Sequence, residues 1–342
     1  MLLVLGAFAP LAAFAAGGGA AAYLKKPDEW FATAEAKQVA TTILSYQSDL
    51  GGWPKNTDTV DAPYTGDRGE LHPTFDNGAT TDELRFLARC YDATKDGVYQ
   101  KAFSKGLGYI LKAQYPNGGW PQYYPPGQRY HRYITFNDGA IERLMGFLRE
   151  VSSKDTYAFV PEKERVAAGE AFDKGIDCIL KCQIKVDGKL TVWCAQHDEV
   201  DFSPRMARAY ELASFSGAES AGLTRLLMSL DKPSPEVIKA VDGAVAWFEA
   251  AKIKGIRLER RPDPSTKRGT NLIVVADPEG SPLWARFYDL KTEKPFFCDR
   301  DGVPKSSVVE IGSERRNGYS WYGTWPQKLL DQEYSEWNRR NR

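Results

Sequence analysis

The sequence predicts a mainly α-helical protein built from three helical hairpins, with short β-strands in its C-terminal part. Three observations lead to this prediction. The pattern Phe-x-x-Gly-Ala begins at Phe75 and again at Phe136, and each copy precedes apolar residues at helical spacing. A segment with Gln and then Trp follows two predicted helices, as at Gln114 and Trp120. Beyond Lys254 the apolar runs become short, with Pro and Gly between them, which is typical of brief strands.

An internal repeat organises most of the chain. Gln47, Gln114 and Gln183 are each followed by a tryptophan, and these tryptophans lie far enough apart for two helices and two loops. The double glycine that precedes the first two tryptophans is absent before Trp193. A third helix start at Phe215 keeps the Gly of the pattern and loses its Asp. The repeat therefore indicates three α/α hairpin units.

Helical periodicity marks the individual elements in chain order. Ser234 and Pro235 open one of the helices as its N-cap and first helical residue. Strands are predicted near 256–259, 271–276 and 285–288, and a last short helix is predicted near Pro326. The other helices are predicted around 39–46, 84–91, 103–110, 141–148, 172–180 and 223–230.

The charges of the chain balance, because it contains 45 Lys and Arg residues and 45 Asp and Glu residues. A net charge of zero gives no argument for nucleic acid or a membrane surface as a partner, so local clusters must attract any charged substrate. Five cysteines, an odd number, do not indicate a disulfide framework in a chain of this length. Cys90, Cys178 and Cys182 lie in helical patterns, where we expect buried thiols.

The N-terminal residues 1–22 are rich in Leu, Ala and Phe, and Ala13-Phe14-Ala15 has the character of a cleavage site. We interpret them as a secretory signal peptide, although no Lys or Arg precedes the apolar run. The rest of the chain, residues 23–342, is predicted to form one domain, since toroids and barrels commonly reach this length undivided. A secreted or periplasmic monomer is expected.

Two aspartates stand at the start of predicted helices. Asp138 lies in Asn137-Asp138-Gly139, and Asp76 lies in a related turn with the Asp and Asn transposed. An Asp in this place commonly caps the free N–H groups of the first helical turn. A carboxylate on a rigid rim can also bind a cation, and its recurrence in the repeat favours this second function. His197 lacks the neighbours of a zinc site or a catalytic triad, and we interpret it as structural.

Arginines occur together with aromatic residues in the C-terminal third. Arg286 and Arg300 lie in strand-like or turn segments, and Arg315 begins a stretch that leads to Tyr319 and Tyr322. Such arginines commonly stack on rings and pair with nearby glutamates. They can equally recognise carboxylates on a substrate, for which the guanidinium fork is suited. Composition leaves both interpretations open.

Six motifs occur in the order known from one enzyme family: Gly-Gly-Trp-Pro-Lys-Asn, Asp-Asn-Gly-Ala-Thr-Thr, Phe-Asn-Asp-Gly-Ala, Gln-His-Asp, Ala-Arg-Ala-Tyr-Glu and Trp-Tyr-Gly-Thr-Trp-Pro. Together they resemble the pectate lyases of polysaccharide lyase family ten, over nearly the whole chain from Ala34 to Trp325. The resemblance implies an (α/α)3 toroid with an open groove. It also implies calcium-dependent β-elimination of α-1,4-linked polygalacturonate, the pectin backbone, to 4,5-unsaturated oligogalacturonides, with Ca2+ as the cofactor.

The resemblance also assigns roles to residues. Asp76 and Asp138 match the family's acidic positions at the calcium centre. Arg208, in Ala-Arg-Ala-Tyr-Glu, best matches the arginine that acts as the base, and Arg205, one helical turn earlier, is the runner-up. Substrate contacts are expected from Arg286, Arg300, Arg315, Trp120 and Tyr322.

These residue types suit β-elimination, which removes the proton α to a uronate carboxylate and expels the glycosidic oxygen. The charge that develops spreads onto the carboxylate, where calcium and arginine can stabilise it. Two aspartates make a weak calcium site, so the substrate carboxylate should complete it. Because arginine has almost no neutral form near neutral pH, an alkaline optimum follows if an arginine is the base.

Two other functions remain as alternatives. An inverting glycoside hydrolase needs two carboxylates roughly 6.5–9.5 Å apart. The candidates for them are Asp76 with Asp138, or Glu142 with Asp198. A non-catalytic protein that binds acidic glycans needs a platform of aromatic rings, and the candidates are Trp53, Trp120, Tyr123 and Tyr124. Formation of a conjugated double bond on polygalacturonate would distinguish a lyase from both.

Overall fold

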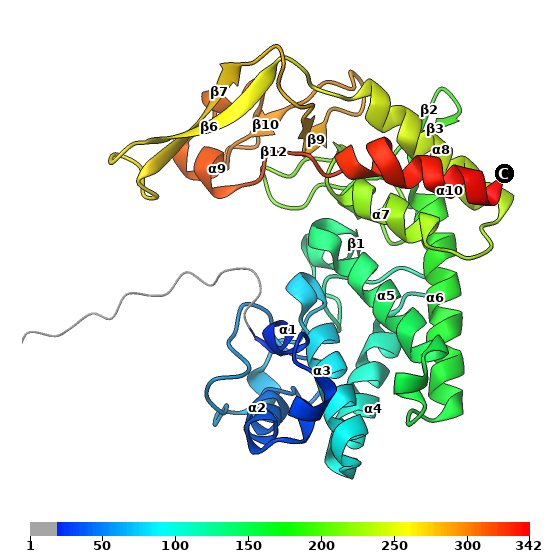
Figure 1. Ribbon diagram of the computed structural model, residues 1–342. Helices are drawn as coiled ribbons and strands as arrows, with labels where there is room; N and C mark the ends of the chain where they lie inside the picture. Colours follow the sequence, from blue (N-terminus) through cyan, green and yellow to red (C-terminus); the bar gives the residue numbers. More distant parts are fainter. Residues whose placement is uncertain (1–18) are drawn as a thin grey trace, which may run out of the picture.

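The computed structural model describes residues 19–342, and three helical hairpins form the main part of the molecule (Figure 1). The mainly helical fold and the three hairpins predicted from the repeat are confirmed. Helix α2 (Ala34–Ser45) precedes the hairpins. The hairpins are α3 (Thr81–Thr94) with α4 (Gly97–Ala113), α5 (Ala140–Ser153) with α6 (Glu162–Cys182), and α7 (Glu219–Met228) with α8 (Pro235–Ala250).

The hairpins lie side by side in two layers. Helix α5 contacts both α3 and α7 in one layer, and α6 contacts both α4 and α8 in the other. The turn before α3 contacts the turn before α5, and the turn before α5 contacts α7. The amino ends of α3, α5 and α7 therefore meet at one end of their layer. Side chains from these three ends can act on one site.

Local signals explain where the helices begin. Thr80 and Glu83 form a capping box at α3, in which the Glu83 carboxylate accepts the Thr80 backbone N–H at 2.8 Å. The predicted start of α8 is confirmed, because the Ser234 hydroxyl accepts the N–H of Val237 and Pro235 is the first helical residue. The apolar faces of the hairpin helices enter one continuous core.

The repeated tryptophans are core residues. The indole N–H of Trp53 donates to the carbonyl of Ile43 at 2.7 Å, and Trp120 bonds Ile110 in the same way at 3.0 Å. Trp193 repeats the bond, and a fourth tryptophan, Trp284, does so after α8. All four are fully buried. Each indole thus satisfies a carbonyl near the end of a preceding helix.

Burial corrects one part of the predicted substrate site. Trp120 was expected to contact substrate, and Trp53 and Trp120 were candidates for an aromatic platform. Both predictions are wrong, because 0% of either side chain is exposed and each indole N–H is already bonded. Their regular spacing arises from the packing of the hairpins.

The repeated glutamines are also structural. Each side-chain amide donates to a carbonyl in the following loop and to a carbonyl of a neighbouring helix, with bonds of 2.8–2.9 Å. Gln47 thus joins Gly51 to Ala102 of α4. Such bonds bind one repeat to the next. The three pairs of acceptors are Gly51 and Ala102, Gly118 and Ala171, and Thr191 and Ala240.

A smaller β-containing region follows α8, and its apolar side chains form a second core around Phe297 and Trp321. The predicted strands near 256–259, 271–276 and 285–288 are confirmed, the last being interrupted at Arg286. A π-helical turn, Leu329–Glu333, leads into α10 (Tyr334–Asn341), the last helix predicted near Pro326. The antiparallel pairs are β6 (Ile256–Pro262) with β7 (Thr270–Ala276), β8 (Trp284–Ala285) with β12 (Tyr322–Gly323), and β10 (Phe297–Cys298) with β11 (Pro304–Lys305).

One short strand pair connects the hairpins with this region. Strand β5, immediately before α7, pairs with β9 of the C-terminal region. Helix α9 (Ser313–Gly318) also contacts β7. The C-terminal segments are thus placed beside the amino end of α7. The remaining pairs are β1 (Ile134–Thr135) with β4 (Gln196–His197), β2 (Lys185–Val186) with β3 (Lys189–Leu190), and β5 (Phe215–Ser216) with β9 (Phe287–Tyr288).

The predicted signal peptide, residues 1–22, lies outside the described residues up to residue 18. Its last residues contribute to α1 (Ala20–Tyr23), which contacts α3 and buries Ala20. All five cysteines are buried and free, which confirms the expectation for the three helical ones. Between residues 19 and 342, no helix is both long and apolar enough to cross a membrane.

Candidate active site

Two short turns place the predicted aspartates at the amino ends of α3 and α5. Residues Asp76–Gly78 and Asn137–Gly139 each form one 3-10 turn with left-handed backbone inside it. The φ angle is 55° at Asn77 and 51° at Asp138, and a glycine with positive φ follows each. Asn and Asp tolerate this conformation better than most residues. The two turns therefore have the same backbone conformation. The carboxylate is on the first residue of the turn at Asp76 and on the second residue at Asp138.

Hydrogen bonds define the alignment of the third repeat. The Phe75 N–H donates to Gln122 O, and the Phe136 N–H donates to Ala195 O, in each case two residues after a repeated tryptophan. In the third copy it is Gly217, not Phe215, whose N–H donates to the equivalent carbonyl. That carbonyl belongs to Arg286, two residues after Trp284. The third copy lacks the Asp, as the sequence indicates, but Glu219 stands where Asp138 stands in the second copy, so an acid is retained at this position.

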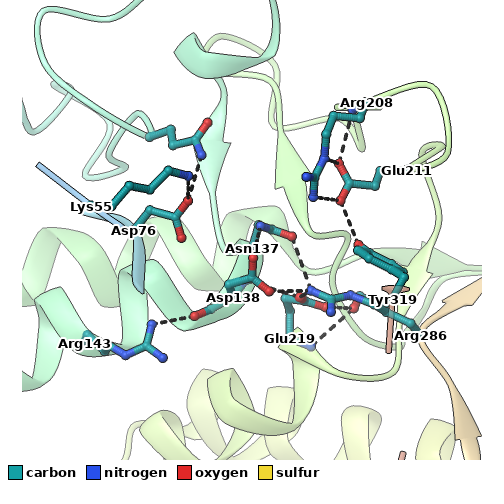
Figure 2. Close-up of polar contacts among 12 residues, drawn as sticks. Lys55, Asp76, Asn137, Asp138, Arg143, Arg208, Glu211, Glu219, Arg286 and Tyr319 are labelled. Atoms are coloured by element: carbon teal, nitrogen blue, oxygen red, sulfur yellow. Dashed lines mark hydrogen bonds and ion pairs between the residues drawn. The ribbon is translucent and has the colours of Figure 1, made fainter. Parts of the chain in front are cut away.

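Asp76 is buried between two side chains from other repeats. Its carboxylate pairs with the Lys55 ammonium and accepts the Gln122 side-chain amide at 3.0 Å (Figure 2). Lys55 and Gln122 are each the second residue after a repeated tryptophan. Only 6% of the Asp76 side chain is exposed, and its Oδ1 has no hydrogen-bond partner within residues 19–342. Such an unpartnered buried oxygen is costly without a ligand.

Asp138 is more open than Asp76 and pairs with an arginine. Its Oδ1 accepts Arg286 Nη2 at 2.8 Å, its Oδ2 accepts the Asn137 amide at 2.7 Å, and 40% of the side chain is exposed. Burial alone would raise the pKa of Asp138, but the charge and hydrogen bond of Arg286 outweigh it, and the pKa is lowered. The side chain makes no N-cap bond, since Gly139 is the N-cap of α5. The capping interpretation of Asp138 is therefore wrong.

Arg286 is fixed by the acid of the third repeat. Its guanidinium pairs with Glu219, whose other carboxylate oxygen accepts the Ser216 hydroxyl. The side chains of Arg286 and Glu219 are 9% and 2% exposed. Burial would lower the pKa of Arg286, but the charges of Glu219 and the other acids raise it overall. The cation is therefore permanent, and it also lies over the Tyr319 ring at 4.8 Å.

Arg208 lies on a loop beside this cluster. It donates to Glu211 through Nε at 2.7 Å and through Nη2, and Glu211 also accepts the Tyr319 hydroxyl at 2.7 Å. Burial would lower the pKa of Arg208, but the hydrogen bond and charge of Glu211 raise it overall. Figure 2 shows Tyr319 between the Arg208–Glu211 pair and Arg286. Tyr319 thus links the two arginines, because its hydroxyl donates to the partner of Arg208 and its ring lies against Arg286.

Arg205 has other partners than Arg208. The prediction placed them one helical turn apart, but residues 204–211 form an irregular loop, so this expectation is wrong. Arg205 donates to Asp198 at 3.0 Å and lies 3.7 Å from Asp201. His197 is fully buried and bonded to the carbonyl of Phe202 and the N–H of Cys194, which confirms its structural role.

The other predicted arginines surround Tyr210. Arg300 and Arg315 both pair with Glu314, and their guanidinium carbons lie 5.8 and 4.7 Å from the Tyr210 ring centre. Arg208 lies 4.9 Å from the same ring. Three cations therefore gather around one ring. Tyr322 packs on Phe297 in the second core, with their ring centres 4.9 Å apart.

Two pockets are lined by residues of this site or by neighbours of the turns. The first, of about 450 Å3, is lined by Arg208, Arg300 and Tyr210 among others. The second, of about 870 Å3, is lined by Lys55 and Gln122, the partners of Asp76. Tyr130 lines both. The arrangement offers carboxylates from the turns on one side and fixed arginines on the other, which suits an anionic ligand held with a cation.

Sequence reasoning missed three polar residues of this site and placed a fourth in the wrong register. Lys55 and Gln122 could have been found from the repeat, because both follow its tryptophan by two residues, as Arg286 does. Glu211 lies in the same short motif as Arg208. Glu219 was seen but placed in the wrong register, and only the hydrogen bonds of the third turn correct it.

Comparisons with known proteins identify the family. A family model described as pectic acid lyase matches residues 47–330. A solved structure of a family 10 polysaccharide lyase from Cellvibrio cellulosa has 35% sequence identity and a TM-score of 0.77, over 93% of this chain and 96% of the other. An aspartate-to-alanine mutant of a family 10 lyase from the same organism, in complex with trigalacturonic acid, gives the same identity and TM-score over 93% and 97%. A search of curated proteins found no match.

The likeness in fold and sequence makes this chain a polysaccharide lyase of family 10. The chain belongs to the pectic acid lyase family, and it is an enzyme of the pectate lyase type. The resemblance inferred from six motifs is thereby confirmed. Because the chain belongs to this lyase family, the two alternative functions, an inverting glycoside hydrolase and a non-catalytic glycan-binding protein, are rejected.

Proposed function

We propose that this enzyme cleaves α-1,4-linked polygalacturonate by calcium-dependent β-elimination and releases 4,5-unsaturated oligogalacturonides. The observation that carries the proposal is the meeting of two carboxylate-bearing turns with the fixed cations Arg286 and Arg208. A polyanion with a carboxylate on every sugar suits such a site. The trigalacturonic acid in the complex of the similar lyase supports the choice of substrate.

The residues of the two turns fit a calcium ion. Asp76 Oδ1 is buried without a hydrogen-bond partner among the described residues, and Asp138 is partly exposed beside it. Carboxylate oxygens are the ligands that calcium prefers. Between residues 19 and 342 no three His, Cys, Asp or Glu side chains form a metal cluster, so substrate and water would supply the other ligands. Bound calcium would neutralise the substrate carboxylate and stabilise the charge that develops on it.

The side chains of this chain have the remaining tasks. Arg286, held by Glu219, would bind the carboxylate of the sugar that loses its proton. Arg208 is proposed as the base, with Arg205 as the alternative. Because Glu211 raises the pKa of Arg208, its neutral form is rarer still, and activity should rise with pH into the alkaline range. Arg300 and Arg315 would attract neighbouring carboxylates, and Tyr322 would act only at the margin of the site.

The architecture and the setting of the enzyme belong to the same proposal. Hairpins that lie side by side in two layers support an (α/α)3 toroid as the arrangement of residues 23–342 in one catalytic domain. The apolar N-terminal sequence supports export, to the cell exterior or the periplasm, where pectate occurs. We propose a monomer, because the site is composed from one chain.

The test is the ultraviolet absorbance of polygalacturonate incubated with the enzyme, because β-elimination creates a conjugated double bond. Absorbance should increase with calcium present and stop on addition of a chelator. Restoration by calcium after chelation would complete the assignment. An increase that is indifferent to the chelator would reject calcium, and sugar release without absorbance would reject β-elimination.

A further inference from the structure

We propose that the pocket beside Lys55 is a separate subsite for a galacturonate unit of the same pectate chain, with Lys55 and His131 as its polar contacts. The inference rests on the proposed function and deepens it. The proposed subsite binds a second galacturonate unit outside the pocket that contains Arg208. The enzyme should therefore prefer substrates long enough to reach both pockets.

The pocket adjoins residues of the catalytic site. It has a volume of about 870 Å3, and its lining includes Lys55 and Gln122, which contact Asp76 directly. Tyr130 lines this pocket and also the pocket that contains Arg208 and Arg300. A linear polymer bound at Arg208 can therefore extend past Tyr130 into the second pocket.

Aromatic rings form one wall of the pocket. The ring centres of Tyr130 and His131 are 4.0 Å apart, and those of Tyr123 and His131 are 5.1 Å apart. All three residues are partly buried, so each ring keeps one part in contact with its neighbours and another part open. The pocket also includes Leu71 and Pro73. Apolar and aromatic walls with a few polar groups are typical of sites for small ligands, and they suit the C–H face of a sugar.

Lys55 gives the pocket its charge. It is the one Lys or Arg in the lining, and 35% of its side chain is exposed. Its ammonium has three donors, of which Asp76 takes one, so others remain for a ligand. Glu70 is the one carboxylate in the lining. Calcium bound to Asp76 would weaken the ion pair between Asp76 and Lys55. The Lys55 ammonium would then be free to pair with a uronate carboxylate of the substrate.

The polymer itself supplies the matching groups. Polygalacturonate has a carboxylate on each unit, so a chain whose carboxylate meets the arginines also presents a carboxylate to a cation farther along. A neutral glycan would leave Lys55 without this partner. The chemical class of the ligand is therefore a uronate and not a neutral sugar.

The experiment compares kcat/KM on oligogalacturonates of increasing length for the full enzyme and for His131→Ala. His131 does not touch Asp76, so its removal leaves the two turns intact. We expect kcat/KM on long oligomers to fall roughly three- to tenfold through a higher KM, the range expected for one aromatic contact. The shortest cleaved oligomer should react at the original rate. Equal falls at every length, or no fall with long oligomers, would overturn the subsite.

Lys55→Met tests the charge, with Lys101→Met, an exposed lysine on α4, as the matched control. Lys55→Met should lower kcat/KM more for long oligomers than for short ones. Lys101→Met should leave kcat/KM unchanged at every length. If Lys55→Met lowers kcat/KM by the same factor at all lengths, Lys55 acts only through its ion pair with Asp76. That result would overturn its role in the subsite. Circular dichroism of each variant confirms folding. Failure of the proposed function is distinct, since the unmodified enzyme would then form no calcium-dependent double bond at any length.

Discussion

The two aspartate turns have the same backbone and opposite surroundings. Asp76 is buried, and Lys55 and Gln122 hold one of its oxygens while the other has no partner in residues 19–342. Asp138 is 40% exposed and pairs with Arg286 across the site. The carboxylate stands at the first position of one turn and at the second position of the other.

This difference shows how a structural repeat becomes a site. The hairpins supply two equivalent rims, and the exchange of Asp and Asn aims one carboxylate from each rim at a shared space. At the position where one turn has Asp, the other turn has Asn. A substitution of Asp by Asn therefore introduces a residue that already occupies the equivalent position of the other turn. Asp76→Asn and Asp138→Asn are therefore well-matched probes, because the backbone accepts both residue types.

The largest effect should come from Arg208, which belongs to neither turn. Arg208→Lys keeps the charge but loses the planar fork that Glu211 holds. We expect kcat to fall at least ~10²-fold with little change in KM, as for a positioned acid–base group. Arg205→Lys, whose partner is Asp198, should be milder. If the ranking is reversed, the base is Arg205, and a rise in KM alone would make Arg208 an anchor for a carboxylate.

Asp138→Asn should have the next largest effect. It removes the open carboxylate of the proposed calcium site while Asn77 shows that Asn fits this backbone. Calcium affinity should fall by at least about tenfold, the lower end for groups that only support a metal ligand. Calorimetry with calcium and thermal unfolding measure this together. A large loss of stability with unchanged calcium affinity would show that Asp138 serves the fold alone.

Asp76→Asn should be nearly as damaging but partly reversible. The substitution removes a charge with little change in shape, and Asn137 occupies the equivalent position of the second turn. Turnover at low calcium should fall strongly, and millimolar calcium should restore part of it. A calcium titration of initial rates is the measurement. If the midpoint of that titration does not move, Asp76 does not bind the metal.

Glu219→Gln should have a moderate effect confined to the second turn and Arg286. The amide keeps the size of the side chain but removes the charge that fixes the guanidinium. KM for polygalacturonate should rise roughly tenfold, the order expected from about 1.5 kcal/mol, while kcat changes less. Glu219→Asp provides a comparison that retains the charge. A fall in kcat alone, with KM unaltered, would contradict this positioning role.

Glu142→Gln should have the smallest effect on activity and a measurable effect on stability. Burial and then the charge of Glu219 raise the pKa of Glu142 from 4.5 to about 7. The unfolded chain therefore loses this proton at lower pH than the folded chain does, so stability present below pH 4.5 is lost as pH rises through 7. Glu142→Gln should recover up to about 3 kcal/mol at pH 8 and little at pH 4. If the variant and the original enzyme differ in free energy of unfolding by the same amount at pH 4 and pH 8, the raised pKa of Glu142 is contradicted.

Most of the fold could be predicted because the repeat has a physical cause. Apolar periodicity gives the helices, and the Gln and Trp of each repeat recur because each closes the same hydrogen bonds. The same regularity misled the substrate prediction for Trp120, since a conspicuous aromatic residue in a Gly-rich loop can equally belong to the core. Exposure, which distinguishes the two, depends on packing that spacing alone does not reveal.

The site could be predicted only in part. Asp76, Asp138 and Arg286 were singled out from the sequence, and the structure brings Arg286 and Asp138 into contact. Their roles in calcium and substrate binding stay predictions. Glu219 and the loop around Arg208 were placed wrongly, because a turn shortened by two residues and an irregular loop leave no periodic signal. Such features depend on contacts between distant segments.

The most direct test of the account is a calorimetric titration of calcium into the slow variant Arg208→Lys, with and without trigalacturonic acid. If the two turns form one metal site that the substrate carboxylate completes, calcium should bind weakly alone and much more tightly with the trisaccharide. Calcium should then strengthen binding of the trisaccharide by the same factor. Equal calcium affinity in both titrations would contradict a site shared between the turns and the substrate.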